Sequence, residues 1–102
     1  MSRIIEINNF NDHESFIHNN ERGVIFFGSV NCPHCHDMVP FFQDISVKYP
    51  NVGFAHVEVT KVDVDNVNGV PVFVAYQAGN PVDTVVGART KSLVNMIETK
   101  LL

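Results

Sequence analysis

The chain of 102 residues contains no tryptophan, only two cysteines and only seven lysine or arginine residues. It has eleven acidic residues, so its formal net charge is -4, and no basic cluster of the kind that attracts nucleic acid or anionic lipid is present. No stretch approaches the roughly 20 apolar residues of a membrane-spanning helix. We therefore expect neither nucleic acid nor membrane as a partner.

Residues 1–15 lack the features of a secretory signal, since they contain neither an apolar core of about 7–15 residues nor a small-residue cleavage site. We therefore expect a cytoplasmic protein. The length is typical of one domain, so residues 1–102 are predicted to form a single unit, with a monomer as the default state. A hydrophobic content of 45% is enough to bury a core without disulfide staples.

Both cysteines lie in one short segment, NCPHCH at residues 31–36, together with two of the five histidines. Three kinds of site use such a segment. A C-x-x-C pair can be a redox dithiol, a C-x-x-C-H segment can attach haem covalently, and Cys and His together can bind zinc. The segment alone does not distinguish these, so its surroundings must.

The segment is predicted to join a buried strand to a helix. Residues 24–27 are a continuous apolar run, typical of a strand covered on both faces. Pro33 directly follows Cys32, and proline is favoured in the first turn of a helix, because its missing N–H has no partner there. We expect a helix over 33–49 that is kinked at Pro40.

The rest of the chain alternates between strand and helix patterns. Asn11 and Thr90 are expected to cap the first and last helices, and residues 61–70 are predicted to be a loop with at most a short helix. Four to five strands with helices on both faces give an α/β fold around a central mixed sheet. The other predicted strands are 3–7, 52–59, 72–76 and 82–86, and the other predicted helices are 12–20 and the segment from residue 90 onward.

This arrangement resembles the thioredoxin family over nearly the whole chain. The family has a C-x-x-C between a central strand and a helix, a proline five residues after the second cysteine, an X-Pro before a hairpin and a glycine at the end of the last strand. In this sequence those features are Cys32 to Cys35, Pro40, Val70-Pro71 and Gly87.

The resemblance implies a thioredoxin fold and a protein disulfide oxidoreductase that needs no cofactor or metal. Its partners would be protein disulfides or dithiols, with a reductase or glutathione as redox partner. The dipeptide Pro33-His34 is similar to that of DsbA-type oxidases. The inserted helical domain of those proteins has no counterpart in a chain of this length.

Within that frame, each cysteine has a predicted role. Cys32 lies at a helix start, where free N–H groups and the helix dipole stabilise a thiolate, so it is the expected nucleophile. Cys35 lies one turn further in and is the expected resolving thiol. His34 is expected to stabilise the Cys32 thiolate further, together with Pro33, and so to make the disulfide more oxidising than that of an ordinary thioredoxin.

The resemblance also implies a groove for the substrate chain. Pro71 is expected to be cis, which would place the Val70 backbone beside the disulfide, where it would pair with an extended substrate. Gly87 and Ala88 would line the other side of that groove. For Val70, plain core packing is the alternative.

The sequence departs from the family at two places, the second of which concerns proton transfer at Cys35. Asn31 stands where a tryptophan is usual. Phe26 and His56 stand at the positions of a buried aspartate and a neighbouring lysine, so the acid is missing. His56 is either a proton relay for Cys35 or a core histidine, and Glu58, two residues along the same strand, is a weaker candidate for the carboxylate.

Other readings remain open at this point. A haem site would need Met38 or Met96 as its distal ligand, in a chain with more strands than small c-type cytochromes have. A zinc site would need four ligands, and those of the segment are too close together to surround one ion. A non-catalytic interaction module is the main alternative to the enzyme, and His36 is expected to be a solvent-facing bystander.

Overall fold

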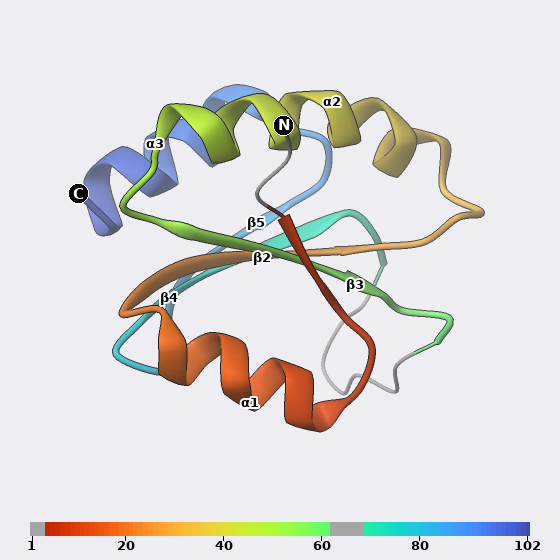
Figure 1. The fold of residues 1–102 in the computed structure, drawn as a ribbon. Helices are drawn as coiled ribbons and strands as arrows, with labels where there is room; N and C mark the ends of the chain where they lie inside the picture. Colours follow the sequence, from red (N-terminus) through yellow and green to blue (C-terminus); the bar gives the residue numbers. More distant parts are fainter. Residues whose placement is uncertain (1–3, 62–68) are drawn as a thin grey trace.

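The computed structural model describes residues 4–61 and 69–102. The predicted elements are present with small shifts in their ends (Figure 1), while Arg3 and most of the predicted loop over 61–70 lie outside the described residues. Along the chain the elements are β1 (Ile4–Ile7), α1 (Phe10–Asn19), β2 (Arg22–Gly28), α2 (Pro33–Lys48), β3 (Gly53–Glu58), β4 (Val72–Gln77), β5 (Asn80–Val86) and α3 (Thr90–Lys100).

The described strands form one mixed sheet of five, in the order β1-β3-β2-β4-β5. The strands β1, β3 and β2 are parallel, whereas β4 is antiparallel to β2 and β5 is antiparallel to β4. Figure 1 shows α2 and α3 on one face of the sheet and α1 on the other. The prediction of a central mixed sheet with helices on both faces is therefore confirmed.

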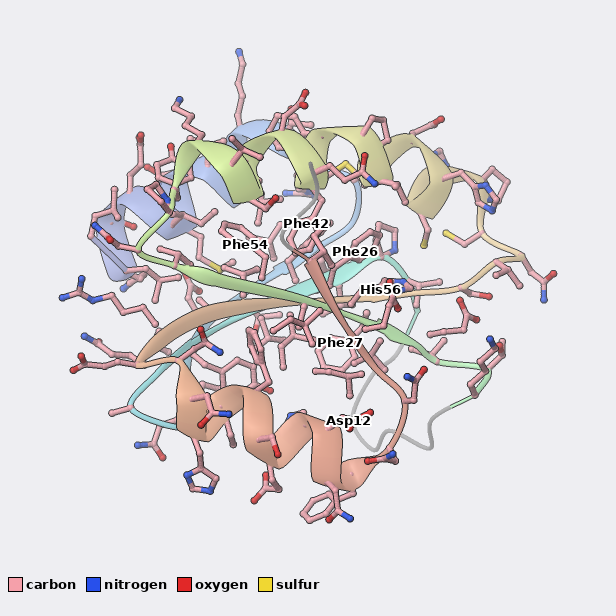
Figure 2. All side chains as sticks on the ribbon, viewed as in Figure 1. Asp12, Phe26, Phe27, Phe42, Phe54 and His56 are labelled. Atoms are coloured by element: carbon pink, nitrogen blue, oxygen red, sulfur yellow. The ribbon has the colours of Figure 1, made fainter. Side chains whose placement is uncertain are left out.

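The apolar run of β2 explains its central position, because its side chains are buried on both faces of the sheet. Phe26 points toward α2. The centroid of its ring lies 5.3 Å from that of Phe42 on α2 and 4.7 Å from that of Phe73 on β4. Phe27 points the other way, into a second cluster with Phe16 of α1 (Figure 2). Burying one such ring stabilises the fold by roughly 1.5–3 kcal/mol, so the two clusters hold both helical layers onto the sheet.

Two predicted helix caps are wrong. The helix α1 begins two residues earlier than expected, and its N-cap is Asn9, whose side chain accepts the Asp12 N–H over 2.8 Å. Asp12 in turn accepts the N–H of Asn8 over 3.0 Å, so this pair, and not Asn11, satisfies the helix start. The N-cap of α3 is Arg89, without a side-chain bond, and Thr90 is the first helical residue.

Candidate active site

The helix α2 begins at Pro33, and Cys32 is its N-cap in an extended conformation. The Sγ of Cys32 accepts the backbone N–H of Cys35 over 3.1 Å, as the side-chain oxygen of a conventional N-cap does. Pro33 lacks an N–H and so leaves no donor unpaired at the first helical position. The predicted placement of the two cysteines at a helix start is confirmed.

The two thiols differ in exposure, because Cys32 is partly exposed whereas Cys35 is only 3% exposed. Burial, followed by a hydrogen bond with Cys32, raises the pKa of Cys35 to about 11 against the opposing effect of the Ser29 backbone, and the charges of Cys32 and Glu58 add smaller increases. Gly28 makes room for the Phe26 ring beside Cys35, since a Cβ at that position would lie 2.9 Å from the ring, whereas its 3.5 Å distance to the Cβ of Cys35 would be an ordinary contact. Sequence reasoning did not identify this glycine.

The Val70-Pro71 segment lies beside Cys32 in the structure, although Val70 is 38 residues away in sequence. The Val70–Pro71 peptide bond is cis, as the resemblance implied, and the Sγ of Cys32 lies 3.8 Å from the Val70 carbonyl oxygen. Gly87 donates its N–H to the Pro71 carbonyl over 2.8 Å, so the end of β5 is tied to the same segment. Ala88 follows Gly87 and is exposed.

His34 is exposed in the first turn of α2, next to the dithiol in sequence. It makes no hydrogen bond or ion pair with any residue in the described part of the chain. Its expected influence on Cys32 therefore depends only on its proximity to that residue along the chain.

The loop before Cys32 is held by two side chains that sequence reasoning treated as secondary. His36 places its Nε2 2.8 Å from the carbonyl oxygen of Val30, to which it donates a hydrogen bond. The expectation of an uninvolved His36 is thus wrong, although its side chain is exposed as predicted. Val30 also donates its backbone N–H to the carboxylate of Glu58, so this one loop residue is held from α2 and from β3.

Glu58 is 9% exposed at the end of β3, and its carboxylate is well supplied with donors. It accepts the Thr60 hydroxyl over 2.6 Å and the Thr60 N–H over 3.4 Å. Burial by itself raises the pKa of Glu58, but the donors from Thr60 and Val30, together with His56, outweigh burial and hold the pKa below its usual value of 4.5. At neutral pH this side chain is therefore an anion close to Cys35.

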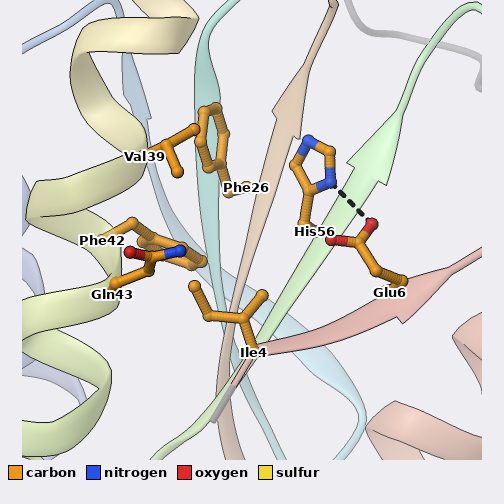
Figure 3. A pocket seen from close by; sticks show the side chains of 7 residues that line it. All are labelled: Ile4, Glu6, Phe26, Val39, Phe42, Gln43 and His56. Atoms are coloured by element: carbon orange, nitrogen blue, oxygen red, sulfur yellow. Dashed lines mark hydrogen bonds and ion pairs between the residues drawn. The ribbon is translucent and has the colours of Figure 1, made fainter. Parts of the chain in front are cut away.

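His56 lies beside Phe26, as the predicted register required, since the two residues are paired between β2 and β3. Their rings meet edge to face with centroids 5.2 Å apart. The Nδ1 of His56 lies 2.8 Å from the Oε2 of Glu6 on β1 (Figure 3), so His56 has an acidic hydrogen-bond partner. Sequence reasoning missed Glu6, although its position opposite His56 follows once β1 is paired with β3.

Two neighbouring pockets of about 150 Å³ each share Phe26, Val39 and His56. The first contains Glu6 and, as Figure 3 shows, is also lined by Val39, Phe42 and Gln43 of α2. The second contains Cys35, His36 and Glu58. His56 therefore stands between its partner Glu6 and the pocket that reaches the buried thiol.

Residues 4–61 and 69–102 contain no group of three or more His, Cys, Asp and Glu side chains arranged to hold a metal ion. No helix in the same residues combines the length and the apolar character needed to cross a bilayer.

The sheet order, the cysteine at the N-cap of α2 and the buried second thiol one turn on define the class of thiol–disulfide oxidoreductases. The family model described as "Thioredoxin" matches residues 4–99. Thioredoxin 1 of Plasmodium falciparum is 31% identical over 91 residues, which cover 85% of this chain and 88% of the relative.

Solved structures agree with this match. A structure of Plasmodium falciparum thioredoxin has a TM-score of 0.90 at 28% identity and covers 95% of this chain and 99% of its own. A second structure, also with a TM-score of 0.90, has 25% identity and covers 96% and 98% of the two chains. It comes from work on the thiol resolving mechanism in yeast mitochondrial 1-Cys peroxiredoxin via glutathione/thioredoxin systems. This chain belongs to the thioredoxin family.

Proposed function

We propose that this protein exchanges its Cys32–Cys35 dithiol with disulfides of protein substrates, with Cys32 as the nucleophile. The observation that carries the proposal is the hydrogen bond from the Cys35 N–H to the Cys32 Sγ at the start of α2. A helix N-terminus favours the negative charge of a thiolate, and Cys32 is the partly exposed member of the pair. Cys35 is buried one turn further in and resolves the mixed disulfide.

The exchange has two steps, in which electrons pass in pairs. The Cys32 thiolate attacks one sulfur of the substrate disulfide, a mixed disulfide forms, and the other substrate sulfur leaves as a thiolate that takes up a proton. Cys35 then loses its proton and attacks the Sγ of Cys32, which releases the second substrate thiol. The substrate is reduced by two electrons, and the protein is oxidised to the Cys32–Cys35 disulfide.

We place the substrate chain along Val70 and Pro71, with Gly87 and Ala88 on the other side of the groove. The 3.8 Å approach of the Cys32 Sγ to the Val70 carbonyl supports this placement, since a substrate bound to Cys32 would run beside that backbone. An extended peptide can pair with such a segment by main-chain hydrogen bonds. A reductase or glutathione is the proposed redox partner, and a cytoplasmic location and a monomeric state stay predictions.

The potential of the disulfide is a separate proposal. We propose that His34, with Pro33 beside it, makes the pair more oxidising than that of an ordinary thioredoxin, since a nearby imidazole favours the thiolate of the reduced form. Equilibration in glutathione buffers measures the potential directly. A value at or below about -270 mV, that of thioredoxin, contradicts the proposal.

Insulin reduction, driven by dithiothreitol and followed by turbidity, tests the exchange itself. Cys32→Ser is expected to abolish activity, whereas Cys35→Ser is expected to accumulate a mixed disulfide visible by mass spectrometry. Lys100→Ala, at the exposed end of α3, is the matched control and keeps full activity. Full insulin reduction by Cys32→Ser contradicts the proposed nucleophile, and no reduction by the unaltered protein favours an interaction module instead.

A further inference from the structure

The second step of the exchange requires a base for Cys35. Its thiol is buried, and burial is the main cause that raises its pKa in the reduced protein to about 11, so the thiol is protonated at pH 7. The neighbouring position in β2 is occupied by Phe26, which carries no proton acceptor. The base must therefore come from another element that reaches the same pocket.

Glu58 lies near Cys35 but is poorly suited to this role. Its carboxylate already accepts bonds from Thr60 and from the Val30 N–H, which stabilise the anion. The resulting low pKa makes Glu58 a weak proton acceptor. Its charge also opposes a thiolate on Cys35, so Glu58 makes the need for a separate base greater.

His56 is held in a definite orientation by Glu6. A carboxylate can only accept hydrogen bonds, so the 2.8 Å contact requires that the Nδ1 of His56 carry the proton. The Nε2 of a neutral ring then has its lone pair free. Nε2 has no hydrogen-bond partner among the described residues, and Figure 3 shows it directed away from Glu6.

A pocket joins His56 to the thiol. His56 and Cys35 both line the second pocket of about 150 Å³, and a water molecule needs only about 10–15 Å³ of such space. Ser29, His36 and Glu58 also line that pocket, although most of its surface is apolar. Proton transfer from Cys35 to His56 over one water is therefore sterically possible.

We propose that Glu6 and His56 act as a positioned base for Cys35, with Glu6 holding the ring so that Nε2 receives the thiol proton through water. This inference rests on the proposed exchange reaction and describes its second step. The Cys35 proton passes to His56, the Cys35 Sγ bonds to the Cys32 Sγ, and the bond from Cys32 to the substrate sulfur breaks. Glu6, a positioning residue, stabilises the imidazolium that forms.

Four titratable groups surround the His56 ring and bear on any pH dependence. Glu6 faces it from β1, and Glu58 lies two residues along β3 itself. Cys35 and His36 reach the second pocket from α2. The remaining neighbour, Phe26 of β2, is uncharged.

The test is a stopped-flow reaction of the reduced protein with excess 5,5'-dithiobis(2-nitrobenzoate). The first equivalent of coloured thiolate reports attack by Cys32, and the second reports resolution by Cys35. The two phases thus separate the proposed function from this inference. If Cys35→Ser still releases the second equivalent within the turnover, or if Cys32→Ser retains the first fast phase, the exchange scheme itself fails.

His56→Gln is expected to leave the first phase unchanged and to slow the second at least about tenfold at pH 7, since positioned bases contribute roughly 10²–10⁴-fold. The variant then depends on the rare Cys35 thiolate, so its second-phase rate rises about tenfold per pH unit from 7 to 9. The unaltered protein has a shallower rise. Glu6→Gln is expected to change the second phase in the same direction by less.

The chain offers a matched control in a second His–Glu contact, since the Nδ1 of His13 lies 3.3 Å from the Oε2 of Glu14 on α1, on the opposite face of the sheet. His13→Gln and Glu14→Gln are expected to leave both phases and their pH dependence unchanged. An unaltered second phase and pH profile in His56→Gln overturn the proposal. A slow second phase in Glu58→Gln, combined with a normal one in His56→Gln, assigns the base to Glu58 and overturns it as well.

Discussion

The backbone N–H of Cys35 donates to the Sγ of Cys32 over 3.1 Å, so one sulfur caps the turn that carries the other. The two thiols therefore differ in their hydrogen bonds and in their exposure. Cys32 receives a helix N–H and remains partly exposed, whereas Cys35 points into the core between α2 and the sheet. This inequality determines the first prediction.

Cys35 is expected to stay protonated well into the alkaline range. Its pKa of about 11 arises mainly from burial, so thiolate absorbance at 240 nm should show a component near pH 11 that is missing in Cys35→Ser. The tyrosines absorb equally in both proteins and cancel in the difference. Because the pKa is raised above its usual value of 9.0, the stability that this thiol contributes is present below pH 9 and is lost as the pH rises toward 11. Complete titration of both thiols below pH 9 contradicts the prediction.

Glu58 is expected to contribute to acid sensitivity. Its pKa lies below 4.5, so its stabilising effect is present above about pH 4.5 and is lost as the pH falls through the lower, folded-state value. Glu58→Gln should lower the free energy of unfolding at pH 7 by about 1–3 kcal/mol, because the buried donors lose a charged acceptor. The deficit should shrink between pH 5 and pH 3. Urea denaturation at each pH measures it, with the exposed Glu21→Gln as control.

Phe26 is expected to be the most costly aromatic ring to remove near the site. It is 1% exposed and contacts the rings of Phe42, Phe73 and His56. Phe26→Ala should lower the free energy of unfolding by about 3–5 kcal/mol, since it leaves a cavity between the sheet and α2. The matched control is Phe10→Ala, because Phe10 is 71% exposed, and its loss should be within about 0.5 kcal/mol. Equal losses from the two variants in urea titrations contradict the assignment of Phe26 to the core.

Gly87 is expected to be required for its backbone conformation. Its φ is +97°, a region that disfavours any Cβ, while the space around it is open enough for a methyl group. Gly87→Ala should therefore lower the free energy of unfolding by about 1–3 kcal/mol through strain alone. Ala78 supplies the reverse substitution as a control. Its φ of 53° is one that glycine adopts readily, so Ala78→Gly should not lower the free energy of unfolding. A neutral Gly87→Ala in thermal and urea unfolding is the contrary result.

The helix caps show where local patterns were insufficient. Asn8 and Asn9 precede α1 and Asn11 lies in its first turn, and each has a side chain able to cap a helix. Asn9 is the cap because its backbone is extended and its side chain accepts the N–H of Asp12, three residues later. The Asp12 carboxylate in turn accepts the N–H of Asn8. Hydrophobic periodicity predicts that a helix exists but leaves its first residue uncertain.

Some residues of the candidate site could likewise be predicted from local sequence, whereas others could not. Cys32, Pro33 and Cys35 are neighbours in sequence, so their arrangement at a helix start could be predicted from local chemistry. Glu6 and His56 are fifty residues apart and meet only because β1 pairs with β3 in register. No local pattern distinguishes Glu6 from any other charged residue on an edge strand, so its role could not be predicted.

By itself the sequence determined the order of strands and helices and the turn that carries the dithiol, because apolar periodicity and proline chemistry act over a few residues. Only the tertiary structure decided which side chains surround that dithiol. Glu6 reaches His56 through strand pairing, Glu58 and His36 hold the Val30 loop from separate elements, and Val70 meets Cys32 across the molecule. These contacts depend on strand order and register, which are properties of the folded sheet as a whole.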